Sequence, residues 1–356
     1  MAYGGPVTKL RLLGGALAEL CDVEIWTADY GIDGRKVRGS AVRVDGVHVR
    51  YLRTLATYRW SPVCVGVAHA LREFAPSVVH CFGYRDPLTS LAAWAAHRRK
   101  IPYIAEPLGM TGLGHRSGQL KRLVDRTVGA WYLANATCVV ATSLAEESDL
   151  KARGCSRLRV RANPVHFMEA DRPQLALNRE VGWVGRISKS KNLPLLISAI
   201  ALLPSASLTI IGPDDGDGAL DDLRAAAEKH KVWDRVRVCG PLYGDDLWGQ
   251  LGQVAVVVSC SHQESFGNAV VEAAAIGLPC VVTPGVGAGP TLAALGAAAV
   301  APETPEGLAE AIESIFTGTV SSELRRATAA AVRAEFAVDR VAHLQHSIYS
   351  EALAQQ

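Results

Sequence analysis

The chain has 356 residues, which is more than one ordinary hydrophobic core holds, and we therefore expect two domains. Hydrophobic residues make up 49% and charged residues 20% of the sequence, a composition that excludes a mostly disordered chain and suits a globular protein. The net charge of +2 gives no support for nucleic-acid binding, and no lysine or arginine run is long enough for a polyanion-binding tail.

Short β-branched runs alternate with helical stretches along the first half of the chain. We expect strands at residues 22–27, 47–52, 77–82, 102–107 and 137–142, with helices such as 61–74 and 87–99 between them. This alternation predicts a parallel sheet covered by helices on both faces.

The start of the chain departs from this pattern, because residues 1–20 pass from a glycine turn directly into an amphipathic helix. Losing a central strand would forfeit about five buried side chains at roughly 1.5 to 3 kcal/mol each, as much as the whole net stability of a domain. We therefore expect that the native start lies about ten residues upstream, or that the chain has been trimmed.

A second series of strands is expected at residues 180–185, 206–212, 235–240, 254–260 and 278–283, again with helices between them. The polar, proline-containing stretch from 162 to 180 predicts a linker. The predicted fold class is therefore α/β, with two doubly wound parallel-sheet domains.

No charged-then-apolar leader opens the sequence, and no apolar run is long enough to span a bilayer. The eight cysteines are scattered without a CxxC pair, and most lie in apolar runs. They predict reduced core residues. We expect a cytoplasmic protein, with at most peripheral contact at the inner face of the membrane.

The stretch "CSHQESFGNAVVE" passes from a strand end to Gly267, after which Asn268 begins a predicted helix. The first amides of such a helix have no partner within it and attract anions. Glu264 lies before this helix and Glu272 in its second turn, near the carboxyl end of a strand, where open α/β sheets bind ligands. Two carboxylates there suit the hydroxyls of a sugar or ribose; the alternative is a surface residue and a residue that favours the helix start.

A second candidate site contains two cationic side chains. In "VGWVGRISKSKN", a strand ends at Gly185, and Arg186 and Lys191 precede a helix that begins near Asn192 or Leu193. Arginine and lysine at a strand end suit a diphosphate, although a solvated loop explains the pattern too. Gly4 and Gly5 before the first helix would let a ligand approach the backbone or would simply form a turn.

Together these motifs resemble, in this order, the retaining glycosyltransferases of family four, over almost the whole chain. Gly4 and Gly5 match the family's opening glycine loop, "SVVH" with His80 matches its "DVVH" strand, and Gly185, Arg186 and Lys191 match its "GR...K" site. "ESFGNAVVE" matches its pair of glutamates, and "GLPCVV" matches its following strand.

The resemblance implies the GT-B fold of two facing Rossmann-like domains. Residues 1–165 would bind the acceptor and residues 178–335 the nucleotide sugar. Residues 336–356 would form a helix that packs back on the N-terminal domain.

The resemblance also implies roles for single residues. Glu272 would bind the donor ribose, Glu264 would lie against the donor sugar, and Arg186 and Lys191 would neutralise the departing diphosphate. The donor site would also include the residues matched to the glycine motifs and to the start of the helix, namely Gly4, Gly5, Gly185, Phe266, Gly267 and Asn268.

The sequence departs from the family at the end of the fourth predicted strand (102–107) and in the loop that follows it. Many members carry a histidine there, whereas this chain has Glu106, with His115 farther along. Together with His80, these two residues are candidates for the acceptor or sugar site.

The resemblance implies transfer of a sugar from a nucleoside diphosphate donor, UDP or GDP, to a hydroxyl acceptor in polysaccharide or glycoconjugate assembly. The acceptor would be a glycan, a lipid-linked intermediate or a small molecule. The family needs no cofactor or metal ion, and the sequence shows no metal-ligand cluster. Two alternatives stay open: a nucleotide-sugar epimerase of the same architecture and a non-catalytic partner subunit that binds nucleotide sugar.

Overall fold

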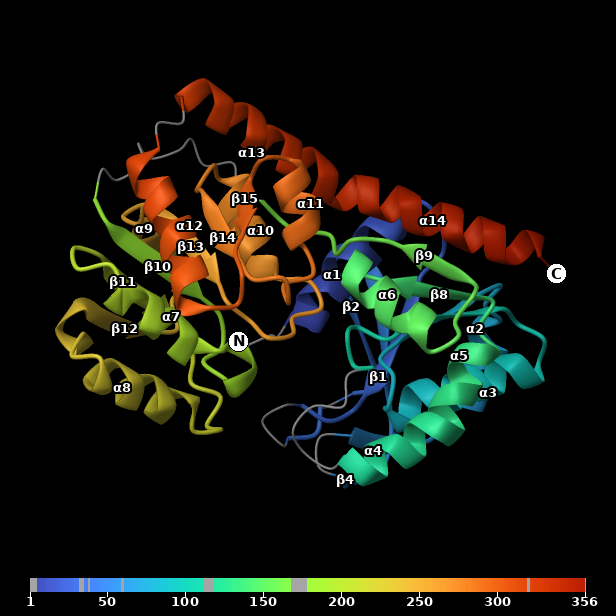
Figure 1. Ribbon diagram of the computed structural model, residues 1–356. Coiled ribbons are helices and arrows are strands. Elements are labelled where there is room, and N and C mark those ends of the chain that lie inside the picture. Colours follow the sequence, from blue (N-terminus) through green and yellow to red (C-terminus); the bar gives the residue numbers. More distant parts are fainter. Residues whose placement is uncertain are drawn as a thin grey trace. The chain divides into compact units, whose positions relative to one another are not determined.

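The computed structural model describes residues 5–31, 35–37, 39–58, 61–111, 118–167, 178–318 and 321–355. The chain forms two compact units (Figure 1). Unit 1 comprises residues 1–164 and 338–356, and unit 2 comprises residues 165–337. None of the described helices is both long enough and apolar enough to cross a membrane.

Unit 1 alternates helices and strands. In chain order its elements are α1 (Gly5–Leu17), β1 (Glu24–Ala28), β2 (Ala41–Val44), β3 (Val47–Leu52), β4 (Thr54–Tyr58), β5 (Ser61–Cys64), α2 (Val67–Phe74), β6 (Val79–Phe82), α3 (Pro87–Arg98), β7 (Tyr103–Glu106), α4 (Gly118–Val124), a π-helical turn (Asp125–Gly129), α5 (Ala130–Ala134), β8 (Cys138–Ala141), α6 (Leu144–Ala152), β9 (Leu158–Val160) and α14 (Val338–Ala354).

The described strands of unit 1 form three separate sheets. Four parallel strands are ordered β6-β7-β8-β9, three strands are ordered β1-β3-β2, and β4 and β5 form a hairpin. The five strands predicted for this half of the chain are all confirmed within a few residues. The last long helix, α14, packs on α1 within the same unit.

The predicted helix over 61–74 is wrong in its first half. Residues 61–64 form strand β5, which pairs antiparallel with β4. Gly66, with φ of 103°, then ends the extended segment and starts α2. Pro62 has no N–H to donate, and an edge strand tolerates this loss, whereas apolar content alone did not distinguish a strand from a helix here. The helix predicted over 87–99 is confirmed as α3.

Unit 2 is a doubly wound sheet with helices packed around it (Figure 1). Its elements are β10 (Glu180–Val184), a 3-10 turn (Lys189–Lys191), α7 (Leu193–Ala201), β11 (Ser207–Ile211), α8 (Ala219–Lys229), a second 3-10 turn (Trp233–Arg235), β12 (Val236–Gly240), α9 (Gly244–Leu251), β13 (Val256–Ser259), α10 (Asn268–Ala275), β14 (Cys280–Val282), α11 (Gly289–Ala294), β15 (Ala298–Val300), α12 (Pro305–Thr317) and α13 (Ser322–Phe336).

The described strands of unit 2 form one parallel sheet in the order β12-β11-β10-β13-β14-β15. Its core is built from side chains such as Val181, Leu208 and Val256 on the strands and Leu196 and Ile200 on α7, all fully buried. The predicted α/β class, with two parallel-sheet units, is confirmed.

The predicted linker falls largely on residues 168–177, which lie outside the described part of the chain. All eight cysteines are free, as predicted, and five of them are buried.

Candidate functional site

Strand order places the candidate site at the middle of the unit 2 sheet. The chain continues from β10 toward β11 and β12 on one side, and from β13 toward β14 and β15 on the other. At such a switch point the loops after the two central strands diverge and leave a crevice, where open α/β sheets bind ligands. The predicted donor residues of unit 2 lie on these two loops and on α10, which follows the second loop.

Lys191 and Glu264 meet across this switch point. Lys191 Nζ lies 2.6 Å from Glu264 Oε2, and the two side chains are 18% and 22% exposed. Ser261 Oγ also donates to Glu264 Oε2, at 3.0 Å, and the thiol of Cys260 donates to the carbonyl of Lys191. The pair is therefore held from both loops and still reaches solvent, so a ligand could compete for either charge.

The amino end of α10 lies directly after Glu264. The helix begins at Asn268, as predicted, and Gly267 before it has φ of 99° and offers no side chain to cap the helix. The first amides of α10 thus have no acceptor within the helix and can bind an anion. A Cβ on Gly267 would lie 2.9 Å from Val286 Cγ1, so only glycine fits this turn without a shift.

The backbone around Glu264 is fixed by a neighbouring loop. The N–H of Glu264 donates to the carbonyl of Gly285 at 2.8 Å, and its own carbonyl accepts from Gly287 at 2.9 Å. The amide of Ala288 likewise donates to the carbonyl of Phe266. The segment before α10 is therefore preorganised rather than loose.

The carboxyl group of Glu272 has no polar partner among the residues that the structure describes. It lies in the second turn of α10, mostly covered by its surroundings, and makes no hydrogen bond or ion pair with any residue that the structure describes. Burial raises its pKa to about 7, because removal from water disfavours the charged form. Hydroxyl groups of a ligand would supply the hydrogen bonds that this carboxylate lacks.

Arg186 and Phe266 are placed differently from each other. Arg186 is 63% exposed and donates to Asp215 at 2.8 Å, so its guanidinium is free to exchange that partner for a phosphate. Phe266 is buried and packs edge-on against Phe336, with ring centroids 5.6 Å apart. Only the backbone of Phe266 is therefore available to a ligand.

Gly212 packs directly against the backbone of Gly185, and sequence reasoning missed it. Gly212 follows the adjacent strand β11 with φ of 147°, and a Cβ on it would lie 1.7 Å from the carbonyl oxygen of Gly185. Its own N–H donates to Gly240, at the end of β12. The available signal was a glycine at the end of each of three successive strands. Gly212 is required for the backbones at this sheet end to approach each other.

In unit 1, His80 and Glu106 belong to a buried charged cluster. Glu106 is fully buried and forms ion pairs with Lys9 of α1 and with Arg161, which are also buried. His80 Nε2 lies 3.2 Å from Glu106 Oε2, and His80 Nδ1 shares a hydrogen bond with the hydroxyl of Tyr349 on α14. Sequence reasoning missed Lys9 and Arg161; the signal for Lys9 was a lysine within an otherwise apolar helical face.

The charges of this cluster offset one another. Burial alone would raise the pKa of Glu106, but Arg161 and Lys9 outweigh it and hold that pKa well below its usual range. Burial lowers the pKa of Lys9 to about 8, against the opposing effect of Glu106. Glu106 is therefore ionised at neutral pH, and neither of its oxygens faces solvent in this structure.

For three of the predicted site residues, Gly4, Gly5 and His115, the structure gives no contact with the candidate site. Gly5 is the first residue of α1, whereas Gly4 and His115 lie outside the described residues. Across the described part of the chain, no three histidine, cysteine, aspartate or glutamate side chains gather in a way that could hold a metal ion.

Two curated relatives align in sequence with more than 70% of this chain. The glycogen synthase of Mycobacterium tuberculosis is 28% identical over 288 residues, which cover 74% of this chain. The GDP-mannose:cellobiosyl-diphosphopolyprenol alpha-mannosyltransferase of Komagataeibacter xylinus is 26% identical over 266 residues, which cover 72% of this chain. In both cases the match spans 65% of the relative's length.

The fold is also found among solved structures. The Anabaena protein Alr3699/HepE, solved in complex with UDP and glucose, superimposes with a TM-score of 0.72 at 18% identity, and the match covers 98% of this chain and 96% of that one. At this identity the likeness shows the fold alone.

Two family models account for nearly all of the chain. The Glycosyl transferase 4-like domain matches residues 4–166, and Glycosyl transferases group 1 matches residues 168–334. Both matches agree with the motifs found in the sequence and with the two parallel-sheet units. The chain therefore belongs to the glycosyl transferases of group 1, the family-four glycosyltransferases with the GT-B fold.

Proposed function

We propose that this chain transfers a sugar, with retention of anomeric configuration, from a nucleoside diphosphate donor to a hydroxyl acceptor. The observation that carries the proposal is the Lys191–Glu264 pair at the switch point of the unit 2 sheet, directly before the amino end of α10. A cation, a carboxylate and unpaired amides in one crevice match the phosphates and hydroxyls of a nucleotide sugar.

The chemistry follows from the charge that the reaction develops. Breaking the bond between sugar and phosphate leaves negative charge on the departing diphosphate, and preorganised cations and amides lower the barrier to that step. Lys191 and Arg186 are each paired with one carboxylate, Glu264 and Asp215 respectively. A diphosphate would take over both cations, and Glu264 would then be free to accept hydrogen bonds from the sugar hydroxyls.

Glu272 would hold the nucleoside part of the donor. Its carboxylate has no protein partner in the described structure, and a ribose presents two adjacent hydroxyls that donate to one carboxylate. Ligand hydrogen bonds favour the ionised form, so binding would lower the pKa of Glu272 from about 7. Uptake of the donor would accordingly release a proton near neutral pH.

UDP or GDP is the proposed donor nucleotide. Support comes from the complex of the Anabaena structure with UDP and glucose and from the name of the GDP-mannose-dependent relative. We further propose an acceptor that is a glycan, a lipid-linked intermediate or a small molecule, in polysaccharide or glycoconjugate assembly. A cytoplasmic location is supported by the eight free cysteines.

The test is the release of sugar from a panel of UDP- and GDP-linked α-sugars in the absence of acceptor, followed by NMR of the anomer formed first. A retaining enzyme gives the α-anomer before mutarotation. First formation of the β-anomer would contradict retention. Tight nucleotide binding without release of sugar, in a panel that also includes candidate hydroxyl acceptors, would favour the non-catalytic partner subunit instead.

A further inference from the structure

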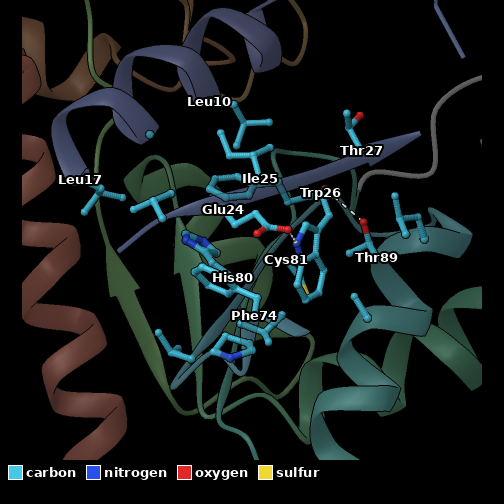
Figure 2. Close-up of a pocket in the computed structure, with 18 of the residues that line it drawn as sticks. Leu10, Leu17, Glu24, Ile25, Trp26, Thr27, Phe74, His80, Cys81 and Thr89 are labelled. Atoms are coloured by element: carbon cyan, nitrogen blue, oxygen red, sulfur yellow. Dashed lines mark hydrogen bonds between the residues drawn. The ribbon is translucent and has the colours of Figure 1, made fainter. Parts of the chain in front are cut away.

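The cavity of unit 1 and the crevice of unit 2 offer a ligand different surroundings. The cavity has a volume of about 370 Å³, and most side chains that line it are apolar, such as Leu10, Ile25 and Trp26 (Figure 2). The loops after the strands of unit 2 instead bring charged and polar side chains together. Because charged donors bind phosphates most strongly, contacts within these loops bear directly on the binding of a diphosphate.

Asn192 lies directly after Lys191 in a left-handed conformation. Its φ is 52° and its ψ is 41°, between the 3-10 turn that ends at Lys191 and helix α7. An asparagine at the start of a helix usually caps it, but the side chain of Asn192 makes no capping hydrogen bond to α7. The turn itself does not require this side chain, because glycine adopts a positive φ without strain.

Glu303 holds the side chain of Asn192. The side-chain amide of Asn192 donates to Glu303 Oε1 at 3.2 Å, and its nitrogen lies 3.5 Å from Nδ1 of His262. The imidazole of His262 contacts the same carboxylate, and the two form an ion pair when the imidazole is protonated. The three residues lie on the segments that follow β10, β13 and β15. Glu303 therefore joins three segments that are far apart in the sequence.

The backbone around Lys191 is fixed by the loop after β13. The N–H of His262 donates to the carbonyl of Ser190 at 3.2 Å. The thiol of Cys260 lies 3.3 Å from the carbonyl oxygen of Lys191 and 3.5 Å from that of Asn192. Together with the side chain of Asn192, these contacts hold the residues before, at and after Lys191. The flexible lysine side chain thus starts from a fixed backbone position.

We infer that Glu303 is a positioning residue for Lys191. It acts through the side chains of Asn192 and His262 and holds the lysine where the departing diphosphate needs a cation. The inference rests on the proposed function, in which the diphosphate replaces Glu264 as the partner of Lys191. Once that ion pair is given up, the contacts of Asn192 still orient the lysine. A cation that is already in place stabilises developing charge better than a mobile one.

The exposure of Glu303 separates this role from a role in stability. The side chains of Glu303 and His262 are 34% and 55% exposed, and ion pairs at such exposure contribute little to the free energy of unfolding. Variants at Glu303 are therefore expected to fold, and their properties report on the position of Lys191.

Four variants test the inference. Glu303→Ala removes the contacts, Glu303→Gln keeps an acceptor for Asn192, and Asn192→Gly keeps the turn without the side chain. Glu306→Ala is the matched control, because Glu306 is exposed in the first turn of α12. The release of sugar from UDP- and GDP-linked α-sugars is measured for each variant, with kcat and KM determined separately.

Glu303→Ala and Asn192→Gly are expected to lower kcat about tenfold and to change KM less than about twofold. Glu303→Gln and the control should keep kcat within about twofold of the wild type. In a chain that already carries Lys191→Ala, Glu303→Ala should have no further effect, because it acts through the lysine. A further tenfold loss in that chain would overturn the inference, as would equal kcat values for Glu303→Ala and the control.

Acetylation tests the position of Lys191 without a donor. Acetic anhydride modifies free amines, and peptide mass spectrometry gives the rate at Lys191 relative to Lys229, which is exposed on α8. Glu303→Ala should raise this relative rate about threefold or more, because a lysine held against a carboxylate is protected, while Glu306→Ala leaves it unchanged.

The two measurements distinguish the two proposals. If the wild type releases no sugar but the acetylation rate of Glu303→Ala rises as expected, the proposed function fails and the positioning of Lys191 by Glu303 stands. An unchanged acetylation rate in Glu303→Ala would overturn the inference, whatever the outcome for sugar release.

Discussion

Replacement of Glu272 by glutamine separates stability from binding. The carboxyl group is held with a pKa of about 7 by burial, whereas an unfolded chain gives about 4.3. The folded state therefore binds the proton more tightly than the unfolded state. Stability falls as the pH rises through this window, and the loss is complete above the folded pKa.

The size of the effect follows from the shift. A difference of roughly 2.7 pKa units at 1.36 kcal/mol each corresponds to about 4 kcal/mol, as an upper limit. Glutamine has the same shape and does not ionise. The Glu272→Gln variant should therefore be more stable than the wild type at pH 8, by up to that amount, and only slightly more stable at pH 5.

Nucleotide binding should change in the opposite direction. A glutamine cannot offer a charged acceptor to two hydroxyls, and hydrogen bonds to charged groups contribute about 1.5 to 3 kcal/mol. We expect the dissociation constant for the donor nucleotide to rise roughly 10- to 100-fold at pH 8. A gain in stability with a loss of binding is typical of a functional residue.

The assay is thermal and denaturant unfolding at pH 5, 6, 7 and 8, with titration calorimetry for the nucleotide. Glu310→Gln on α12 is the matched control, since Glu310 is exposed and belongs to the same unit. Equal stability of Glu272→Gln and the wild type at pH 8 would refute the burial argument. An unchanged nucleotide affinity would refute the ribose assignment.

Three further substitutions test other parts of the structure. Lys191→Ala should lower the rate of sugar release about 10²- to 10³-fold with little change in melting temperature, because the pair with Glu264 is partly exposed; Lys189→Ala, an exposed neighbour, is the control, and equal rates for both variants would exclude the proposed role. Gly212→Ala should destabilise unit 2 by at least about 3 kcal/mol in urea unfolding, since the new Cβ would meet the carbonyl of Gly185. Gly216→Ala, where no atom lies within 4 Å but φ is also positive, measures the backbone contribution alone, and an equal loss would refute the steric argument. Glu106→Ala should cost about 3 to 5 kcal/mol by leaving Lys9 and Arg161 without a counter-charge; a loss below about 1 kcal/mol in the same measurement would show that the cluster is solvated.

Much of the fold was predictable because strands in a doubly wound sheet are short apolar runs, and such runs as "SLTII" of β11 and "CVVA" of β8 are evident in the sequence. Strands β9 and β15 were not predicted, because their three-residue sequences LRV and AAV lack the apolar, β-branched character that marks the equally short CVV of β14. The first half of the predicted helix at 61–74 failed because an apolar run of that length fits either structure until Gly66 breaks it.

The loops of the candidate site were predictable from their place after strands, but the contacts between them were not. Lys191 and Glu264 lie on different loops, and only the strand order β10-β13 brings them to 2.6 Å. Lys9 and Glu106 are 97 positions apart, and no local pattern marks a pair at that distance. The ligand roles of the predicted site residues stay predictions until binding is measured.

The central claim is that unit 2 binds a nucleoside diphosphate at the switch point of its sheet. The most direct measurement is a thermal-shift panel of UDP, GDP, ADP and dTDP on the wild type, Lys191→Ala, Arg186→Ala and the control Lys189→Ala. A ligand at about 100 times its dissociation constant adds roughly 2.7 kcal/mol to the state that binds it. We expect one nucleotide to stabilise the wild type and the control but neither site variant. A folded wild type that none of the four nucleotides stabilises, or equal stabilisation of all four proteins, would contradict the claim.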